Sequence, residues 1–258
     1  MGFVTRTGLM SVALLAAMLV ALELGRRYGR RWRATRGGRE PAAFSTVQGA
    51  ILGLLGLLVA FSFSGAAQRF DARRELVTEE ANAIGTAYLR IDLLPPAAQP
   101  ALRDAFRGYV DARLEIYRHI ATPTVAREAR RRAEGLQGVI WQQALAALHD
   151  AQSPAVWTLV VPALNEMFDI ATTRMRAMVL HPPRIVFGLL AGLSLLGAAL
   201  AGFELAARDE APHLVLFAFA FTLAVTFYVI VDLEYPRLGL IRADGADQVL
   251  LDLRASMG

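Results

Sequence analysis

The chain has 258 residues, of which 55% are hydrophobic, and its formal net charge is +4. It contains no cysteine, which excludes disulfides, cysteine-ligated metals and thiol catalysis. Every one of the 27 basic residues is an arginine. These arginines lie beside apolar stretches or alternate with acidic residues, an arrangement that argues against a nucleic-acid-binding surface.

Four apolar stretches, at residues 8–25, 44–67, 185–207 and 213–231, are each long enough to cross a bilayer. A helix of about 20 apolar residues spans the hydrocarbon core of roughly 30 Å. The sequence therefore predicts an all-α membrane protein with four transmembrane helices. The predicted parts are residues 1–67 with the first two spans, an extramembrane helical bundle at 68–183, two further spans at 184–231 and a polar tail at 232–258.

An arginine-rich loop is predicted at residues 26–43, directly after the first span. Its arginines are Arg26, Arg27, Arg30, Arg31, Arg33, Arg36 and Arg39. A signal peptide carries its positive charge before the apolar run, so we interpret this span as an uncleaved anchor, with cleavage as the alternative. The positive-inside rule places the loop in the cytoplasm, and both termini and the bundle outside it.

The second span carries small residues on one helical face. Gly49, Gly53, Gly56, Ala60 and Ser64 follow one another at spacings of four, three, four and four. Such a face lets two transmembrane helices approach closely, which makes a packing seam one interpretation. The other interpretation is a helix that lines a pore or moves against a neighbour.

The helical block begins without a turn signal after the second span. Phe70, Val77, Ile84 and Ile91 continue at heptad spacing, which predicts one helix that runs out of the membrane to about Leu94. Pro95 and Pro96 end it. Three more amphipathic helices are predicted, the first marked by an apolar stripe over 102–120 and the other two by Thr122-Pro123 and Ser153-Pro154 at their starts.

Ionisable residues at span ends are the first candidates for function. They are the carboxylates Glu23, Glu204, Asp232 and Glu234. One interpretation is interfacial salt bridging to nearby arginines; the other is a carboxylate ring at a pore mouth, which would concentrate cations.

Two polar sets beside the membrane are the second candidates. The first is Arg69, Arg73, Asn82 and Thr86, and the second is Asn165, Glu166, Asp169 and Arg174. We expect the two sets to meet, as a gate, an ion vestibule or a structural network. The other acidic and basic residues of 69–80 are interpreted as a solvated helix face. The four histidines lack metal-ligand spacing, so the sequence predicts neither a metal site nor a cofactor, and no enzyme.

Several stretches resemble the bacterial bestrophin-like membrane family, whose members mostly lack an assigned function. They are "FSGAAQRFDARRELVTEEANAIGTAYLRIDLLP" (63–95), "LNEMFDIATTRM" (164–175), "HPP" (181–183) and "DLEYPRLGLIRADGADQVLLDLRASM" (232–257). The resemblance covers roughly residues 44–258. It extends more distantly to true bestrophins, which are pentameric anion or cation channels with four spans, a helical block between the second and third, and a pore lined by the second span.

The resemblance implies a homo-oligomer, a pentamer by analogy, in the bacterial inner membrane, with ions and the lipid bilayer as partners. One departure concerns sidedness, because bestrophins hold the helical block and both termini in the cytoplasm. The favoured function is an oligomeric ion channel with the second span near the pore axis. The alternative is a non-transporting membrane sensor or scaffold whose helical block binds a partner.

Overall fold

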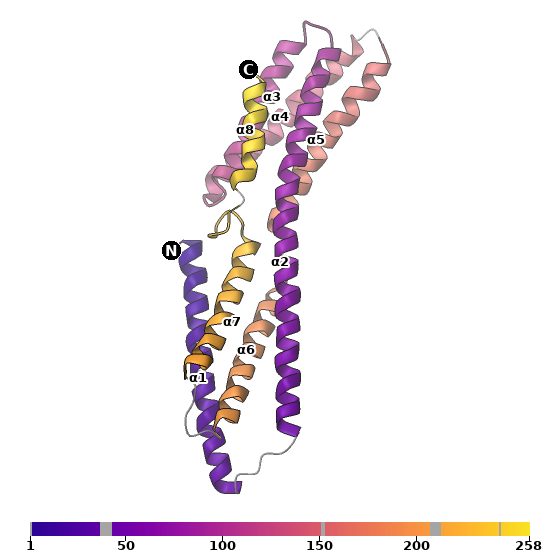
Figure 1. The fold of residues 1–258 in the computed structure, drawn as a ribbon. Coiled ribbons are helices and arrows are strands. Elements are labelled where there is room, and N and C mark those ends of the chain that lie inside the picture. The colour runs from indigo at the N-terminus through magenta and orange to yellow at the C-terminus, as the bar shows by residue number, and fades with distance from the viewer. Residues whose placement is uncertain (1, 37–42, 151–152, 207–212, 243) are drawn as a thin grey trace. The chain divides into compact units, whose positions relative to one another are not determined.

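A computed structural model describes residues 2–36, 43–150, 153–206, 213–242 and 244–258, and this part of the chain contains helices and turns but no strand (Figure 1). The helices are α1 (Phe3–Arg36), α2 (Ala43–Leu89), α3 (Gln99–Arg118), α4 (Pro123–His149), α5 (Ala155–Val179), α6 (Arg184–Leu205), α7 (His213–Glu234) and α8 (Gln248–Ser256). Four helical stretches in the described residues are long and apolar enough to cross a membrane. The predicted all-α class with four spans is confirmed.

The chain divides into two compact units. The first contains Met1–Phe70 and His181–Ile241, and the second contains Asp71–Leu180 and Arg242–Gly258. The predicted bundle at 68–183 therefore corresponds closely to the second unit, except that the end of the tail also belongs to that unit.

Helix α2 is continuous from the second span into the bundle, as predicted. It covers 47 residues without a break and passes into a 3-10 helix at Arg90–Leu93, just before the two prolines. No proline interrupts residues 43–89, so every backbone N–H beyond the first turn keeps its partner in the helix.

In the first unit, α1 and α6 approach each other through glycines. A Cβ added at Gly202 would lie 1.9 Å from the backbone oxygen of Leu22, and one at Gly25 would lie 2.0 Å from the oxygen of Ala199. A Cβ at Gly29 would lie 2.8 Å from the oxygen of Phe203. Backbones this close require glycine, and such contacts hold helices together where lipid leaves little hydrophobic driving force.

Contacts at the two ends of the first unit show that its helices alternate in direction. At one end, the Phe3 ring lies 4.7 Å from the Tyr235 ring, and His181 stacks on Tyr235 at 4.4 Å. At the other end, the Gln48 side chain donates to Glu204 at 2.8 Å. The N-terminus, the start of α6 and the end of α7 therefore share one end of this unit.

The predicted arginine-rich loop at 26–43 is wrong over much of its length, because α1 continues to Arg36. Arginine is a good helix former and no proline occurs before this point, so the helix outlasts the apolar run. The Glu23 carboxylate also accepts a hydrogen bond from Arg27 one turn later, at 2.7 Å. Residues 37–42, including Arg39, lie outside the described part of the chain.

Helices α2, α3, α4, α5 and α8 build the second unit around an apolar core. Its fully buried side chains include Ile84, Phe106, Tyr109, Ile140, Met167 and Leu250. Helix α4 begins at Pro123, as predicted, although the Thr122 side chain makes no capping hydrogen bond. At the start of α5 the Ser153 hydroxyl accepts from the Ala155 N–H at 3.3 Å.

The prediction of a polar tail at 232–258 missed a helix. Helix α8 buries Leu250 and Met257 in the core of the second unit, and the Tyr88 hydroxyl donates to the Met257 carbonyl at 3.1 Å. Leu250, Leu253 and Met257 recur at spacings of three and four, which is the pattern of one helical face.

Replacing Gly202 with alanine should destabilise the first unit. The added methyl group would meet the Leu22 backbone at 1.9 Å, so α1 and α6 must separate. Overpacking of this kind costs about 1–3 kcal/mol in the free energy of unfolding. Unfolding in detergent, followed by circular dichroism, measures the loss. Gly188→Ala is the control, because nothing lies within 4 Å of a Cβ added there on the same helix; equal stability of the two variants would contradict the prediction.

Candidate functional site

The small-residue face of α2 is uncovered in the described chain. Gly49, Gly53, Gly56, Ala60 and Ser64 are all exposed, and nothing described lies within 4 Å of a Cβ added at any of the three glycines. Another side of the helix makes its contact with α6, where a Cβ at Gly197 would lie 3.1 Å from Leu52. The face is thus not packed against any other described helix of this chain.

Glu23 and Glu204, two of the span-end carboxylates, have polar partners nearby. Glu23 pairs with Arg27, and the side chains of both are largely exposed. Glu204 accepts from Gln48 of α2, which ties the start of α2 to the end of α6. Neither carboxylate is buried, so their predicted place in a ring at a pore mouth stays a prediction.

Asp232 anchors the segment that follows α7. Its side chain is fully buried, and its two oxygens accept from the backbone N–H groups of Leu240 at 3.0 Å and Ile241 at 2.7 Å. A Cβ added at Gly239 would lie 2.3 Å from Asp232 Oδ1, so glycine leaves the room for the carboxylate. This buried carboxylate holds a turn in place instead of facing water.

The buried Glu234 makes an ion pair with the partly exposed Arg69 of α2. Arg69 Nε donates to Glu234 Oε1 at 2.8 Å, and its Nη2 contacts the same oxygen. His181 Nδ1 lies 3.6 Å from the other carboxylate oxygen. The pair joins α2 to the end of α7 inside the first unit, which corresponds to the salt bridging considered from the sequence.

The two polar sets contribute only some of their members to contacts in the second unit. Arg73 donates from Nε to the Ala177 carbonyl at 3.0 Å and from Nη2 to the Leu180 carbonyl at 2.9 Å. It thereby satisfies carbonyls at the end of α5, where a cation is favoured. Arg174 also reaches α2, as described below. The remaining members are exposed: Asn82, Thr86, Asn165, Glu166 and Asp169.

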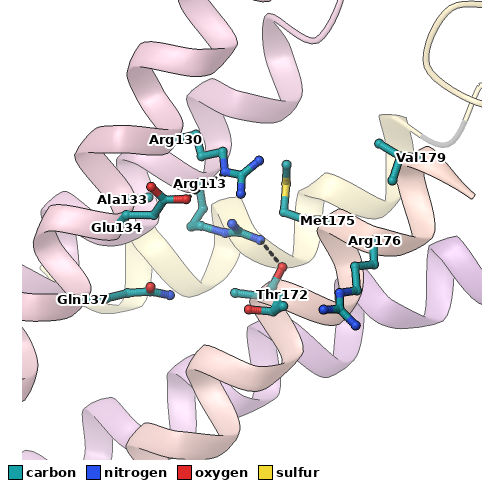
Figure 2. Close-up of a pocket in the computed structure, with 10 residues that line it drawn as sticks. Arg113, Arg130, Ala133, Glu134, Gln137, Thr172, Met175, Arg176 and Val179 are labelled. Carbon is teal, nitrogen blue, oxygen red and sulfur yellow. Dashed lines mark hydrogen bonds and ion pairs between the residues drawn. The ribbon is translucent and has the colours of Figure 1, made fainter.

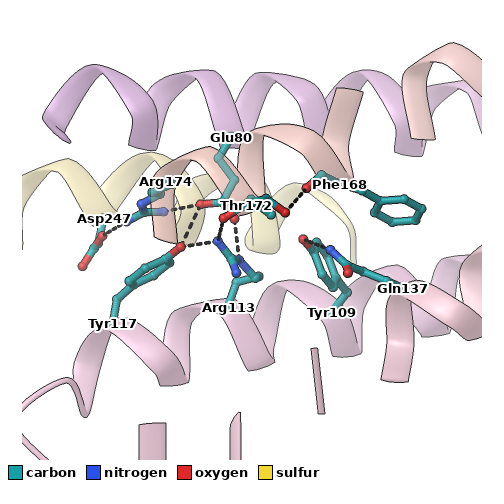
Figure 3. A network of polar contacts seen from close by, with 10 residues as sticks. Glu80, Tyr109, Arg113, Tyr117, Gln137, Phe168, Thr172, Arg174 and Asp247 are labelled. Carbon is teal, nitrogen blue, oxygen red and sulfur yellow. Dashed lines mark hydrogen bonds and ion pairs between the residues drawn. The ribbon is translucent and has the colours of Figure 1, made fainter. Parts of the chain in front are cut away.

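A buried ion cluster lies at the centre of the second unit (Figure 3). Glu80 of α2, which is fully buried, accepts from Arg113 Nε at 2.5 Å and pairs with Arg174 through its other oxygen. The Tyr117 hydroxyl accepts from Arg113 and donates to Glu80 Oε2 at 3.2 Å. The interpretation of 69–80 as a solvated face is therefore wrong for Glu80.

The cluster extends to the C-terminal segment and is electrically balanced. Arg174 Nη2 lies 3.2 Å from Asp247, so two arginines face two carboxylates, and the Arg174 guanidinium covers the Tyr117 ring at 3.5 Å. Burial acts to raise the pKa of Glu80, but Arg113 and Arg174 outweigh it and hold the pKa below its ordinary value. Burial raises the pKa of Tyr117, which stays a neutral donor.

An arginine-lined cavity of about 330 Å³ opens beside this cluster, between α3, α4 and α5 (Figure 2). Its polar lining is Arg113, Arg130, Glu134, Gln137, Thr172 and Arg176, and its apolar lining is Ala133, Ala171, Met175 and Val179. Arg113 belongs to both the ion cluster and the cavity lining, because it pairs with Glu80 on one side and faces the cavity on the other.

The family model for the bestrophin-like domain matches residues 11–244. The chain belongs to the bestrophin-like family. A search of curated proteins finds no match.

Solved structures of bacterial bestrophin homologs share this fold. A single-residue variant of the homolog from Klebsiella pneumoniae superposes with a TM-score of 0.66 at 15% identity, over 95% of this chain and 97% of that chain. Another crystal structure of that homolog gives 0.65 at 16% identity, with the same coverage. The structure of a variant membrane protein gives 0.65 at 16% identity, over 97% and 98% of the two chains. At this identity the likeness shows the fold alone.

Sequence reasoning missed the centre of the ion cluster in this bestrophin-like protein, although a signal was present. Glu80 lies three residues after Val77 and four before Ile84, on the apolar stripe of α2. Arg113 lies four residues from both Tyr109 and Tyr117 on α3. A charge on an apolar stripe indicates burial, and a buried charge indicates a partner of opposite sign.

Replacing Glu80 with glutamine should destabilise the second unit strongly. The change leaves Arg113 and Arg174 buried with too little negative charge, which costs about 3–5 kcal/mol in the free energy of unfolding. Chemical unfolding in detergent measures it. Glu79→Gln is the control, because it removes the same charge from an exposed neighbour. The prediction fails if the two variants lose equal stability.

The stabilisation by Glu80 should disappear in acid. Its pKa is lowered in the folded state from an ordinary value of 4.5, so its contribution is present above that pH and is lost as the pH falls through the folded value. The stability difference between the unmodified protein and Glu80→Gln should therefore shrink from about pH 5 to about pH 2. Unfolding free energies of both proteins across this range measure the difference, and a constant gap would refute the assignment.

Proposed function

We propose that this bestrophin-like protein is a homo-oligomeric ion channel, with α2 nearest the axis and its small face toward the permeation path. The uncovered face of Gly49, Gly53, Gly56, Ala60 and Ser64 carries the proposal. Four spans of one subunit leave no room for an aqueous path, so several subunits must surround it. Copies of α2 placed around an axis would present these small residues to it.

Small residues suit a wall of this kind. A glycine adds no side chain to the lumen, so the helix can lie near the axis without filling it. Ser64 adds a hydroxyl toward the end of the span, and pores select ions through such polar groups and through carbonyl dipoles. The resemblance to bestrophins favours five subunits and an axis lined by the second span.

The four span-end carboxylates enter the proposal with different roles. Glu23 and Glu204 are accessible and are the members able to form a ring that attracts cations. Asp232 and Glu234 are fully buried in contacts of their own subunit, so in this arrangement they hold the end of α7 in place.

We further propose a bacterial inner-membrane location, with the arginine-rich end of α1 in the cytoplasm. Arg26, Arg27, Arg30, Arg31 and Arg33 gather at this end of the first unit. The N-terminus and the end of α7, which share the opposite end, would then be extracytoplasmic. Because the chain lacks cysteine, an impermeant maleimide should label Thr5→Cys but not Thr35→Cys in intact cells, and labelling of Thr35→Cys alone would contradict this orientation.

The alternative, a sensor or scaffold without transport, is favoured by one observation, the arginine-lined cavity in the helical bundle. The two functions differ in a measurable way, because a scaffold gives no ion flux. Purified protein in liposomes, tested with several salts against empty vesicles, distinguishes them. Native mass spectrometry of the detergent complex gives the subunit number, and a monomer would contradict the channel.

Modification of Gly53→Cys should block the flux. A charged methanethiosulfonate reagent reacts with a thiol that faces water, and the added charge and volume would then obstruct the path at every subunit. Flux through reconstituted channels before and after the reagent measures the block.

Leu54→Cys is the matched control on the same helix. Its side chain is 54% exposed in the isolated chain but points about 100° away from Gly53, toward lipid or a neighbouring subunit. Equal block at both positions, or flux in both that is insensitive to the reagent, would overturn the placement of the small face.

A further inference from the structure

The cavity between α3, α4 and α5 holds more positive charge than its own residues neutralise. Three arginines line it, Arg113, Arg130 and Arg176, against the single carboxylate of Glu134. Arg130 Nε donates to Glu134 at 2.8 Å on the same helix, and this pair is more than half exposed. Glu80 already balances Arg113 and Glu134 balances Arg130, so one positive charge, that of Arg176, remains in excess around an opening of about 330 Å³.

Two of the arginines in this cavity have donors without an acceptor among the described residues. Arg113 is only 4% exposed, and its Nε and Nη2 are used by Glu80, Tyr117 and Ala171, which leaves Nη1 without a described partner. No described acceptor pairs with Arg176 of α5 either. In Figure 2 the Arg113 guanidinium lies between Arg130 and Arg176, so donors from three helices surround one space.

We propose that this cavity binds a small organic oxyanion, with the charged group at the arginines and a short aliphatic part against Ala133, Met175 and Val179. A planar guanidinium donates two parallel hydrogen bonds to a carboxylate or a phosphate, which makes several converging arginines a typical site for either group. The cavity volume lies at the lower end of the range for small-molecule sites.

Bound anion would also relieve repulsion within the bundle. Arg176 adds a positive charge beside the paired Arg113 and Arg130, and an uncompensated charge is most unfavourable where water is scarce. A ligand that neutralises the excess charge should therefore raise the unfolding temperature, as any ligand of the folded state does. This site goes beyond the channel proposal and requires no ion conduction, so either can fail alone.

Calorimetric titration of the full-length protein in a neutral detergent tests the site. Butyrate and butyl phosphate carry the two candidate headgroups on one short chain, and at least one should bind saturably and raise the unfolding temperature. Butylammonium and 1-butanol, with the same chain but a positive or no charge, should not bind. Inorganic phosphate should bind more weakly than butyl phosphate, because it lacks the aliphatic part.

Variants locate the binding. Arg176→Gln and Arg130→Gln should each lower the affinity about tenfold, the effect of losing a charge-assisted hydrogen bond. Arg131→Gln is the control: it removes the same charge from α4 at an exposed side chain outside the cavity, and should leave the affinity unchanged. Arg113 is left intact because it also holds Glu80.

The proposal is overturned if neither butyrate nor butyl phosphate binds, if butylammonium binds as well as they do, or if Arg131→Gln weakens binding as much as Arg176→Gln. Equal affinities for inorganic phosphate and butyl phosphate would remove the role of the apolar wall.

Discussion

One uninterrupted helix constrains the rest of this structure. In hydrocarbon, each backbone donor and acceptor must be satisfied within the protein, so residues 44–67 have to be helical. Nothing in the following sequence ends that helix, and α2 reaches Leu89. The same element therefore carries the uncovered small face in the first unit and the buried Glu80 in the second.

The first unit is held by close fit and by buried anchors. Gly25, Gly29 and Gly202 bring the backbones of α1 and α6 into contact. Lipid provides little hydrophobic driving force between helices, so this close van der Waals packing holds the two helices together. Asp232 and Glu234 fasten the end of α7 through backbone amides and Arg69. Asp232 and Glu234, two of the four carboxylates considered for a pore mouth, thus have structural partners, and the apolar span of α2 is the least buried of the four candidate spans.

The second unit is organised by charge. Burying Glu80 is unfavourable by itself, and the two arginines offset that penalty only because they contact both of its oxygens. Nη1 of Arg113 has no acceptor among the described residues, and Arg113 also lines the cavity. Arg113 thus belongs both to the network that holds α2, α3 and α5 together and to the cavity with excess positive charge. In a protein that uses arginine as its only basic residue, guanidinium geometry suits both tasks.

The sequence by itself determined the class, the four spans, the continuity of α2 and the bestrophin-like membership. These follow from apolar run length, from proline positions and from long matching stretches, all of which are local in the chain. Only the tertiary structure decided which polar residues are used. Glu80 meets Arg113 and Arg174 from 33 and 94 residues away, and Arg73, but not Asn82, finds carbonyls on α5. Such pairings depend on how helices far apart in sequence pack, and helical periodicity places a residue on a face without saying what that face meets.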